Sequence, residues 1–196
     1  MPGFSVLLNE KHLVTIATDQ LNVVSVRVHG DCVSPELADL QIDGGIYGDA
    51  INTKHLIWLS EQEIVEGDEV TVNFHEHVEN FDRGKTVDEL YPNKDRGSRG
   101  SESVEDIFRE IALMPKTRES FSFDLETASG EKIRAKTEPE DHGFGFTVLW
   151  NWLHPDVAMV SLTSHSLAGV LNQENGSEYA KFTLRYGQKT SFSVSE

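Results

Sequence analysis

The stretch Val70-Thr71-Val72-Asn73-Phe74-His75 decides the class of the fold, because apolar and polar side chains alternate along it without a break. In an extended strand, successive side chains point to opposite faces, so Val70, Val72 and Phe74 share one buried face. The preceding Glu66-Gly67-Asp68 is typical of a turn. The sequence therefore predicts a half-buried β-strand that follows a tight turn.

Working outward from this strand, short runs of β-branched and aromatic residues recur on both sides and predict further strands. The predicted strands before it are 4–8, 12–18 and 23–29, and those after it are 120–125, 132–137, 144–152, 157–162, 179–186 and 191–194. In the run 144–152, Phe144, Phe146, Val148, Trp150 and Trp152 share one face, which is typical of the inner side of a sheet. No segment of the chain repeats detectably in sequence.

Two segments carry the spacing of amphipathic helices. A short helix is predicted near 53–60, with Asn52 as its N-cap and Leu56 and Leu59 on one face. A longer helix is predicted over 103–114, where apolar residues follow the i, i+3, i+4, i+7 pattern and Pro115 ends it.

The predicted fold class is α+β and β-dominant, with two mostly antiparallel, sandwich-like β-rich lobes and one or two short helices. Residues 1–81 form an acidic lobe that includes the helix near 53–60, and residues 119–196 form the second lobe. Between them, 82–118 holds the helix 103–114 and a charged, glycine-rich stretch that is typical of a flexible linker.

The charge of the chain is concentrated in the first lobe. Residues 1–80 hold three cations and fourteen carboxylates, residues 81–118 hold eight of each, and residues 119–196 hold six cations and eleven carboxylates. This distribution, within a net charge of −16, argues against nucleic-acid and membrane partners and favours a basic protein surface. The single cysteine, Cys32, and the lack of a recognisable signal segment favour the cytoplasm.

Five acids gather around the turn that precedes the first quoted strand: Glu61, Glu63, Glu66, Asp68 and Glu69. We expect them to dock a basic partner, because charge complementarity speeds association and suppresses wrong partners. The resulting hypothesis is a non-enzymatic, cytoplasmic interaction module, in its sharpest form an immunity or antitoxin-like inhibitor that covers a cationic domain.

A second hypothesis is a metal-binding protein or metal-dependent enzyme that uses His75 and His77. Residues two apart on a strand point to the same side, so both imidazoles could reach one ion, with Glu79 or Asp82 as a carboxylate ligand. One imidazole pair is an incomplete ligand set, and two exposed histidines explain the same pattern. No other cofactor is predicted, since nucleophile, phosphate-binding and dinucleotide motifs do not occur. A third hypothesis is a subunit that self-associates through exposed β edges as a homo-oligomer.

Overall fold

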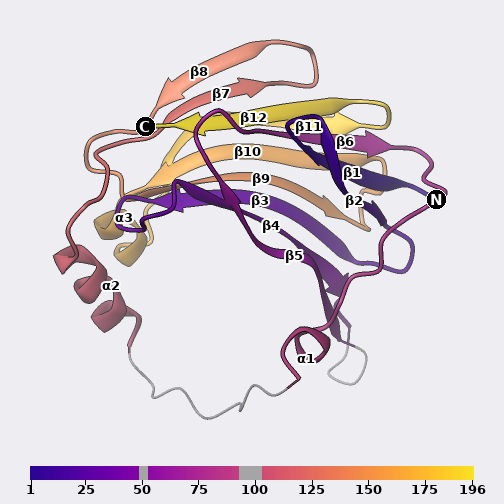
Figure 1. Cartoon of the computed structure of the whole chain (residues 1–196), viewed down its shortest axis with the longest axis horizontal. Helices are drawn as coiled ribbons and strands as arrows, with labels where there is room; N and C mark the ends of the chain where they lie inside the picture. Colours follow the sequence, from indigo (N-terminus) through magenta and orange to yellow (C-terminus); the bar gives the residue numbers. More distant parts are fainter. Residues whose placement is uncertain (49–52, 93–102) are drawn as a thin grey trace.

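The computed structural model describes residues 1–48, 53–92 and 103–196, which build a sandwich of two six-stranded antiparallel sheets (Figure 1). Sheet A has the order β2-β1-β6-β12-β7-β8, and sheet B has the order β11-β10-β9-β3-β4-β5. The strands of the first part of the chain are β1 (Gly3–Leu8), β2 (Lys11–Ala17), β3 (Val23–Asp31), β4 (Ala38–Ile46), β5 (Lys54–Ile64) and β6 (Glu69–His75). Those of the second part are β7 (Ser122–Glu126), β8 (Lys132–Lys136), β9 (Gly143–Asn151), β10 (Val157–His165), β11 (Ser177–Arg185) and β12 (Lys189–Ser195). The predicted β-dominant, sandwich-like class is confirmed.

Three short helices lie outside the sheets: α1 (Val87–Leu90), α2 (Val104–Leu113) and α3 (Leu167–Leu171). The predicted helix 103–114 is present as α2, whose N-cap is Ser103. The predicted helix near 53–60 is wrong, because these residues belong to β5 and pair with β4. Leu56 and Leu59 fit a helical face by spacing alone, and their neighbours Ile57 and Trp58 are typical of strands. Asn52, its proposed cap, lies outside the described residues.

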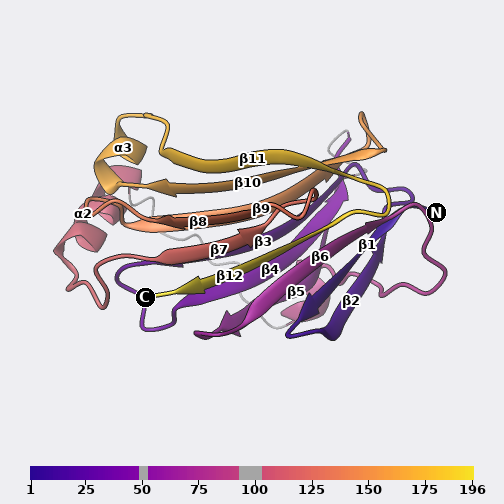
Figure 2. The same ribbon diagram turned by 90° about the horizontal axis from the view of Figure 1, so that it is seen from above.

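The two predicted lobes are the two halves of one sandwich. Residues 1–81 supply β1, β2 and β6 to sheet A and β3–β5 to sheet B, and residues 119–196 supply the remaining strands of both sheets. The halves join where β6 pairs with β12 and β3 with β9. Figure 2 shows the strands of sheet A side by side from β2 to β8.

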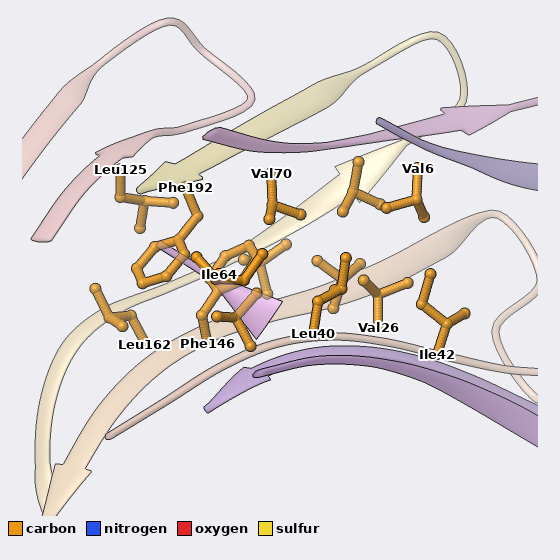
Figure 3. Packing of buried hydrophobic residues seen from close by; sticks show 14 of the residues in the cluster. Val6, Val26, Leu40, Ile42, Ile64, Val70, Leu125, Phe146, Leu162 and Phe192 are labelled. Atoms are coloured by element: carbon orange, nitrogen blue, oxygen red, sulfur yellow. The ribbon is translucent and has the colours of Figure 1, made fainter. Parts of the chain in front are cut away.

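One hydrophobic core runs through both halves. The inward side chains of sheet A, such as Val6, Val70 and Phe192, pack on those of sheet B, such as Leu40 and Phe146 (Figure 3). In β9, Phe144, Phe146, Val148 and Trp150 are buried as predicted, whereas Trp152 is 58% exposed because the strand ends at Asn151.

The two halves repeat one topology, although no repeat is visible in the sequence. Each half makes a hairpin in sheet A, a three-stranded meander in sheet B and a return strand beside the first strand of its hairpin. The cross-strand pair Val24–Gly44 corresponds to Phe144–Ser164, each residue 120 positions later (24 to 144, 44 to 164).

The turns that lead into the return strands confirm this correspondence. At Val65–Asp68 and at Arg185–Gln188, the fourth residue's side chain accepts a hydrogen bond from the first residue's N–H, at 3.0 and 2.7 Å. The third residue is Gly67 (φ 93°) in one turn and Gly187 (φ 80°) in the other. Glycine adopts this left-handed conformation without the steric cost that a side chain adds.

The first residues of the segment 82–118 are hydrogen-bonded to both sheets. Residues 77–86, here called the strap, cross from the edge of sheet A to the edge of sheet B in the first half. Asp82 N donates to Thr15 O of β2 at 2.7 Å, and Lys85 exchanges two backbone hydrogen bonds with Ile57 of β5. The most glycine-rich part of the predicted linker, 93–102, lies outside the described residues.

Candidate functional site

Four carboxylates gather at the β4–β5 margin of sheet B and form what we call the acidic edge: Glu36, Asp39, Glu61 and Glu63. In β4, Ala38, Leu40 and Ile42 point into the core, so the alternation directs Asp39 to the outer face. Asp39 pairs across the strands with Glu63, whose neighbour Ile64 is buried. Figure 1 shows sheet B arched, with this outer face on the concave side.

The electrostatics of the acidic edge are unfavourable to the fold. Partial burial raises the pKa of Asp39, the charges of Glu36, Glu61 and Asp31 raise it further, and His29 opposes them. Among the described residues, none of the four carboxylates has an ion-pair partner, whereas Asp43, farther along β4, pairs with Arg27. Like charges directly opposite each other destabilise a sheet. The ionised form of Asp39 therefore opposes folding, and the fold keeps this carboxylate beside other acids.

We expect Asp39→Asn to stabilise the protein at neutral pH by about 0.2–1 kcal/mol, or about 0.5–4 °C in melting temperature. A raised pKa means that the folded state holds this proton more tightly than the unfolded state. The ionised carboxylate therefore opposes folding at pH values above its folded pKa. This penalty fades as the pH falls through the folded pKa towards the ordinary value of 3.8.

Thermal unfolding of Asp39→Asn and the parent chain, from pH 7 down to the acidic range, measures this effect. The matched control is Asp43→Asn, which loses the Arg27 ion pair and should give no gain. A lower melting temperature for Asp39→Asn at pH 7 would contradict the prediction.

Of the five acids predicted from the sequence, Glu61 and Glu63 belong to the acidic edge. Glu66 is exposed in the turn after β5. Asp68 stabilises that turn, accepting hydrogen bonds from Asn9 Nδ2 at 2.6 Å and from Val65 N at 3.0 Å. Glu69 lies on the outer face of sheet A and lines a shallow hollow there, whose far side is formed by Lys132 and Arg134 of β8.

Glu36 and Asp39 complete the acidic edge, and sequence reasoning missed them. The alternation of β4 indicates that Asp39 faces outward. Its proximity to Glu63 depends on the pairing of β4 with β5, which the prediction of a helix near 53–60 concealed.

The structure places His75 and His77 with different partners. His75 Nε2 lies 2.8 Å from Ser5 Oγ, and His77 Nδ1 lies 2.8 Å from the N-terminal nitrogen. Because β6 ends at His75, the strand alternation that would direct both rings to one side does not extend to His77. Asp82 Oδ2 accepts a hydrogen bond from Thr15 N. Across residues 1–48, 53–92 and 103–196, no group of three His, Cys, Asp or Glu side chains is placed to hold a metal ion.

A buried polar cluster in the second half is a further feature that the sequence did not indicate. Ser164 Oγ donates to Asp141 Oδ2 and lies 3.0 Å from the Tyr179 hydroxyl. Ser164 is 1% exposed, so a substrate has no access to its oxygen. In the first half, the positions that correspond to Asp141, Ser164 and Tyr179 are occupied by Leu21, Gly44 and Leu59, so the polar cluster is not repeated there. We read the cluster as structural.

No helix in the described part of the chain is long and apolar enough to cross a membrane. Comparison of the chain with models of protein families, with curated proteins and with solved structures gave no match. The interpretation of the acidic edge therefore depends on its geometry and charge.

Proposed function

We propose that this protein is a non-enzymatic binding module that recognises a basic protein surface through the acidic edge, Glu36, Asp39, Glu61 and Glu63. The observation that carries the proposal is the gathering of Asp39 with Glu36 and Glu61, whose charges act on it, and with Glu63 across the strands, with no ion-pair partner for any of the four among the described residues. A lysine or arginine side chain of a partner would relieve this repulsion on binding. An inhibitor that covers a cationic domain, as immunity proteins and antitoxins do, would use such a surface.

The position of the acidic edge supports the same reading. It lies on the outer face of sheet B, and Glu61 and Glu63 are exposed on the edge strand β5. A partner can therefore approach both carboxylates without rearrangement of the backbone. Complementary charge at such a site mainly raises the association rate and is weakened by salt.

The test is the affinity for a lysine- and arginine-rich peptide, measured by titration calorimetry at low and moderate salt. We expect the double variant Glu61→Lys/Glu63→Lys to bind this probe about tenfold more weakly, a change equal to about 1.4 kcal/mol. The matched control is Glu119→Lys/Glu131→Lys, which changes the net charge equally at two exposed positions far along the chain.

The control separates a built surface from the general attraction of an acidic protein for basic peptides. A pull-down from the native host, with both double variants in parallel, extends the test to the physiological partner. Equal loss of binding in the two double variants would overturn the proposal, because net charge alone would then explain the affinity.

A further inference from the structure

The duplicated topology allows the two ends of the sandwich to be compared position by position. In the first half, β2 and β5 are the edge strands, and the strap, residues 77–86, crosses them. In the second half, the corresponding edge strands are β8 and β11. Among the described residues, β8 has no backbone pairing except with β7, and β11 has none except with β10. We call the β8–β11 margin the open edge.

The strap bonds to the outward backbone of one residue in β2. Thr15 O accepts from Asp82 N at 2.7 Å, and Thr15 N donates to Asp82 Oδ2 at 2.8 Å. Thr15 pairs with Ser5 in the first hairpin as Arg134 pairs with Asp124 in the second. The N–H and C=O of Arg134 therefore face outward at the open edge, in the geometry that the strap uses on β2.

The inward apolar side chains of β2, the edge strand that the strap covers, are more deeply buried than those of β8 at the open edge. Val14 and Ile16 on β2 are 6% and 0% exposed. Their counterparts Ile133 and Ala135 on β8 are only partly buried against the core. At the open edge, backbone groups and apolar side chains of β8 therefore remain less covered, whereas the strap covers the corresponding groups of β2.

A hollow of about 440 Å³ lies along the open edge, between the β7–β8 turn and β11. Thr127, Ala128, Ser129 and Glu131 line it on one side, and Phe182, Thr183 and Gln188 line it on the other. An extended chain beside β8 would have room for a side chain over Phe182.

The open edge carries five cations in an acidic protein. Arg134, Lys181 and Arg185 form exposed ion pairs with Asp124, Glu178 and Asp156, and the described residues show no ion pair of Lys132 or Lys136. The strand β8, Lys-Ile-Arg-Ala-Lys, has three cations and no acid, and β11 adds Lys181 and Arg185 against Glu178. Lys132, Arg134 and Lys136 are exposed. An acidic segment would therefore be favoured over a neutral or basic one.

From these observations we propose that the open edge is a strand-addition site, at which an extended acidic segment of a partner protein pairs with β8. Strand addition takes its affinity from backbone hydrogen bonds and its selectivity from alternate side chains. A second copy of this chain is disfavoured as the occupant. Its own β8 and β11 would oppose like charges, and its β2 and β5 edges are already bonded to the strap.

The probe for this proposal is a fluorescent synthetic peptide with the sequence of residues 77–86 carrying Arg83→Glu and Lys85→Glu. We expect it to bind the full chain and to shift the amide resonances of β8 in NMR spectra. A second peptide of the same residues, in which Arg83 and Lys85 are retained and Glu79 and Asp82 are replaced by lysine, should not bind.

Two variants of the protein test the site from different sides. Arg134→Pro removes the outward N–H while keeping the β7–β8 pairing, since edge strands tolerate proline at such positions. Lys132→Glu/Lys136→Glu keeps the backbone and reverses the charge. We expect each to weaken binding about tenfold, whereas Lys11→Glu/Lys54→Glu, with the same charge change at the strap-covered edge, should change it less than about twofold.

Circular dichroism and the melting temperature check that the variants fold. If Arg134→Pro does not fold, Lys132→Glu/Lys136→Glu serves as the test. Binding that is unchanged in the variants, or amide shifts that lie away from β8, would overturn the proposal. Sedimentation that shows self-association lost in Arg134→Pro would also overturn it, because a second copy would then occupy the edge.

Discussion

Replacing Phe192 by alanine should lower the free energy of unfolding by about 3–5 kcal/mol, the range for a buried phenylalanine that leaves a cavity. Phe192 is 1% exposed and stacks on Phe146 of the opposite sheet, with ring centroids 4.6 Å apart and planes 3° apart. It also approaches Phe123 and Phe144, at 5.9 and 6.0 Å. Because protein interiors are close-packed, the surrounding rings cannot collapse fully into the space.

Urea unfolding checks this value and also tests whether the two halves form one cooperative unit. Trp58 lies in the first half and Trp150 in the second, and circular dichroism reports both sheets. We expect fluorescence and circular dichroism to give one coincident transition, as two-state unfolding requires. The control Leu153→Ala, at a residue that is 67% exposed, should cost below about 0.5 kcal/mol. Two separate transitions in Phe192→Ala would contradict a shared core.

Replacing Arg118 by methionine should cost about 2–3 kcal/mol, because it removes the hydrogen bonds of a buried charged donor to three partly buried carbonyl groups, of which Ser34 O keeps another donor, Thr117 Oγ1. The Arg118 side chain is 4% exposed. Its Nη1 donates to Asp31 O and Ser34 O at 2.8 and 2.9 Å, and its Nη2 donates to Pro35 O at 3.1 Å. The residue thus ties the start of the second half to the loop between β3 and β4 of the first half.

The ion pair of Arg118 with Glu196 contributes much less, since Glu196 is 59% exposed. We therefore expect Glu196→Gln to cost below about 1 kcal/mol. Urea denaturation of the two variants at neutral pH compares the carbonyl bonds with the ion pair. Equal losses in the two variants would show that the ion pair, and not the carbonyl bonds, dominates the role of Arg118.

The candidate site was only partly predictable from the sequence. Glu61 and Glu63 were found because they lie close together along the chain, and local spacing is visible in a sequence. Asp39 and Glu36 were missed because they approach Glu63 only through the β4–β5 pairing. His75 and His77 have different hydrogen-bond partners, because β6 ends at His75 and the alternation of the strand does not reach His77.

The sequence by itself determined the local structure: alternating side chains fix which residues of Val70–His75 face the core, and glycines fix the turns at Gly67 and Gly187. These features depend on backbone sterics and on burial of one face of a strand, which act over a few residues. The tertiary structure alone decided that Leu56 and Leu59 lie in a strand, since pairing with β4 and the strap outweighs a spacing that also suits a helix.

The tertiary structure also decided that two halves with few identical residues share one topology. Burial requires an apolar side chain at a core position, but it allows several different apolar residues there.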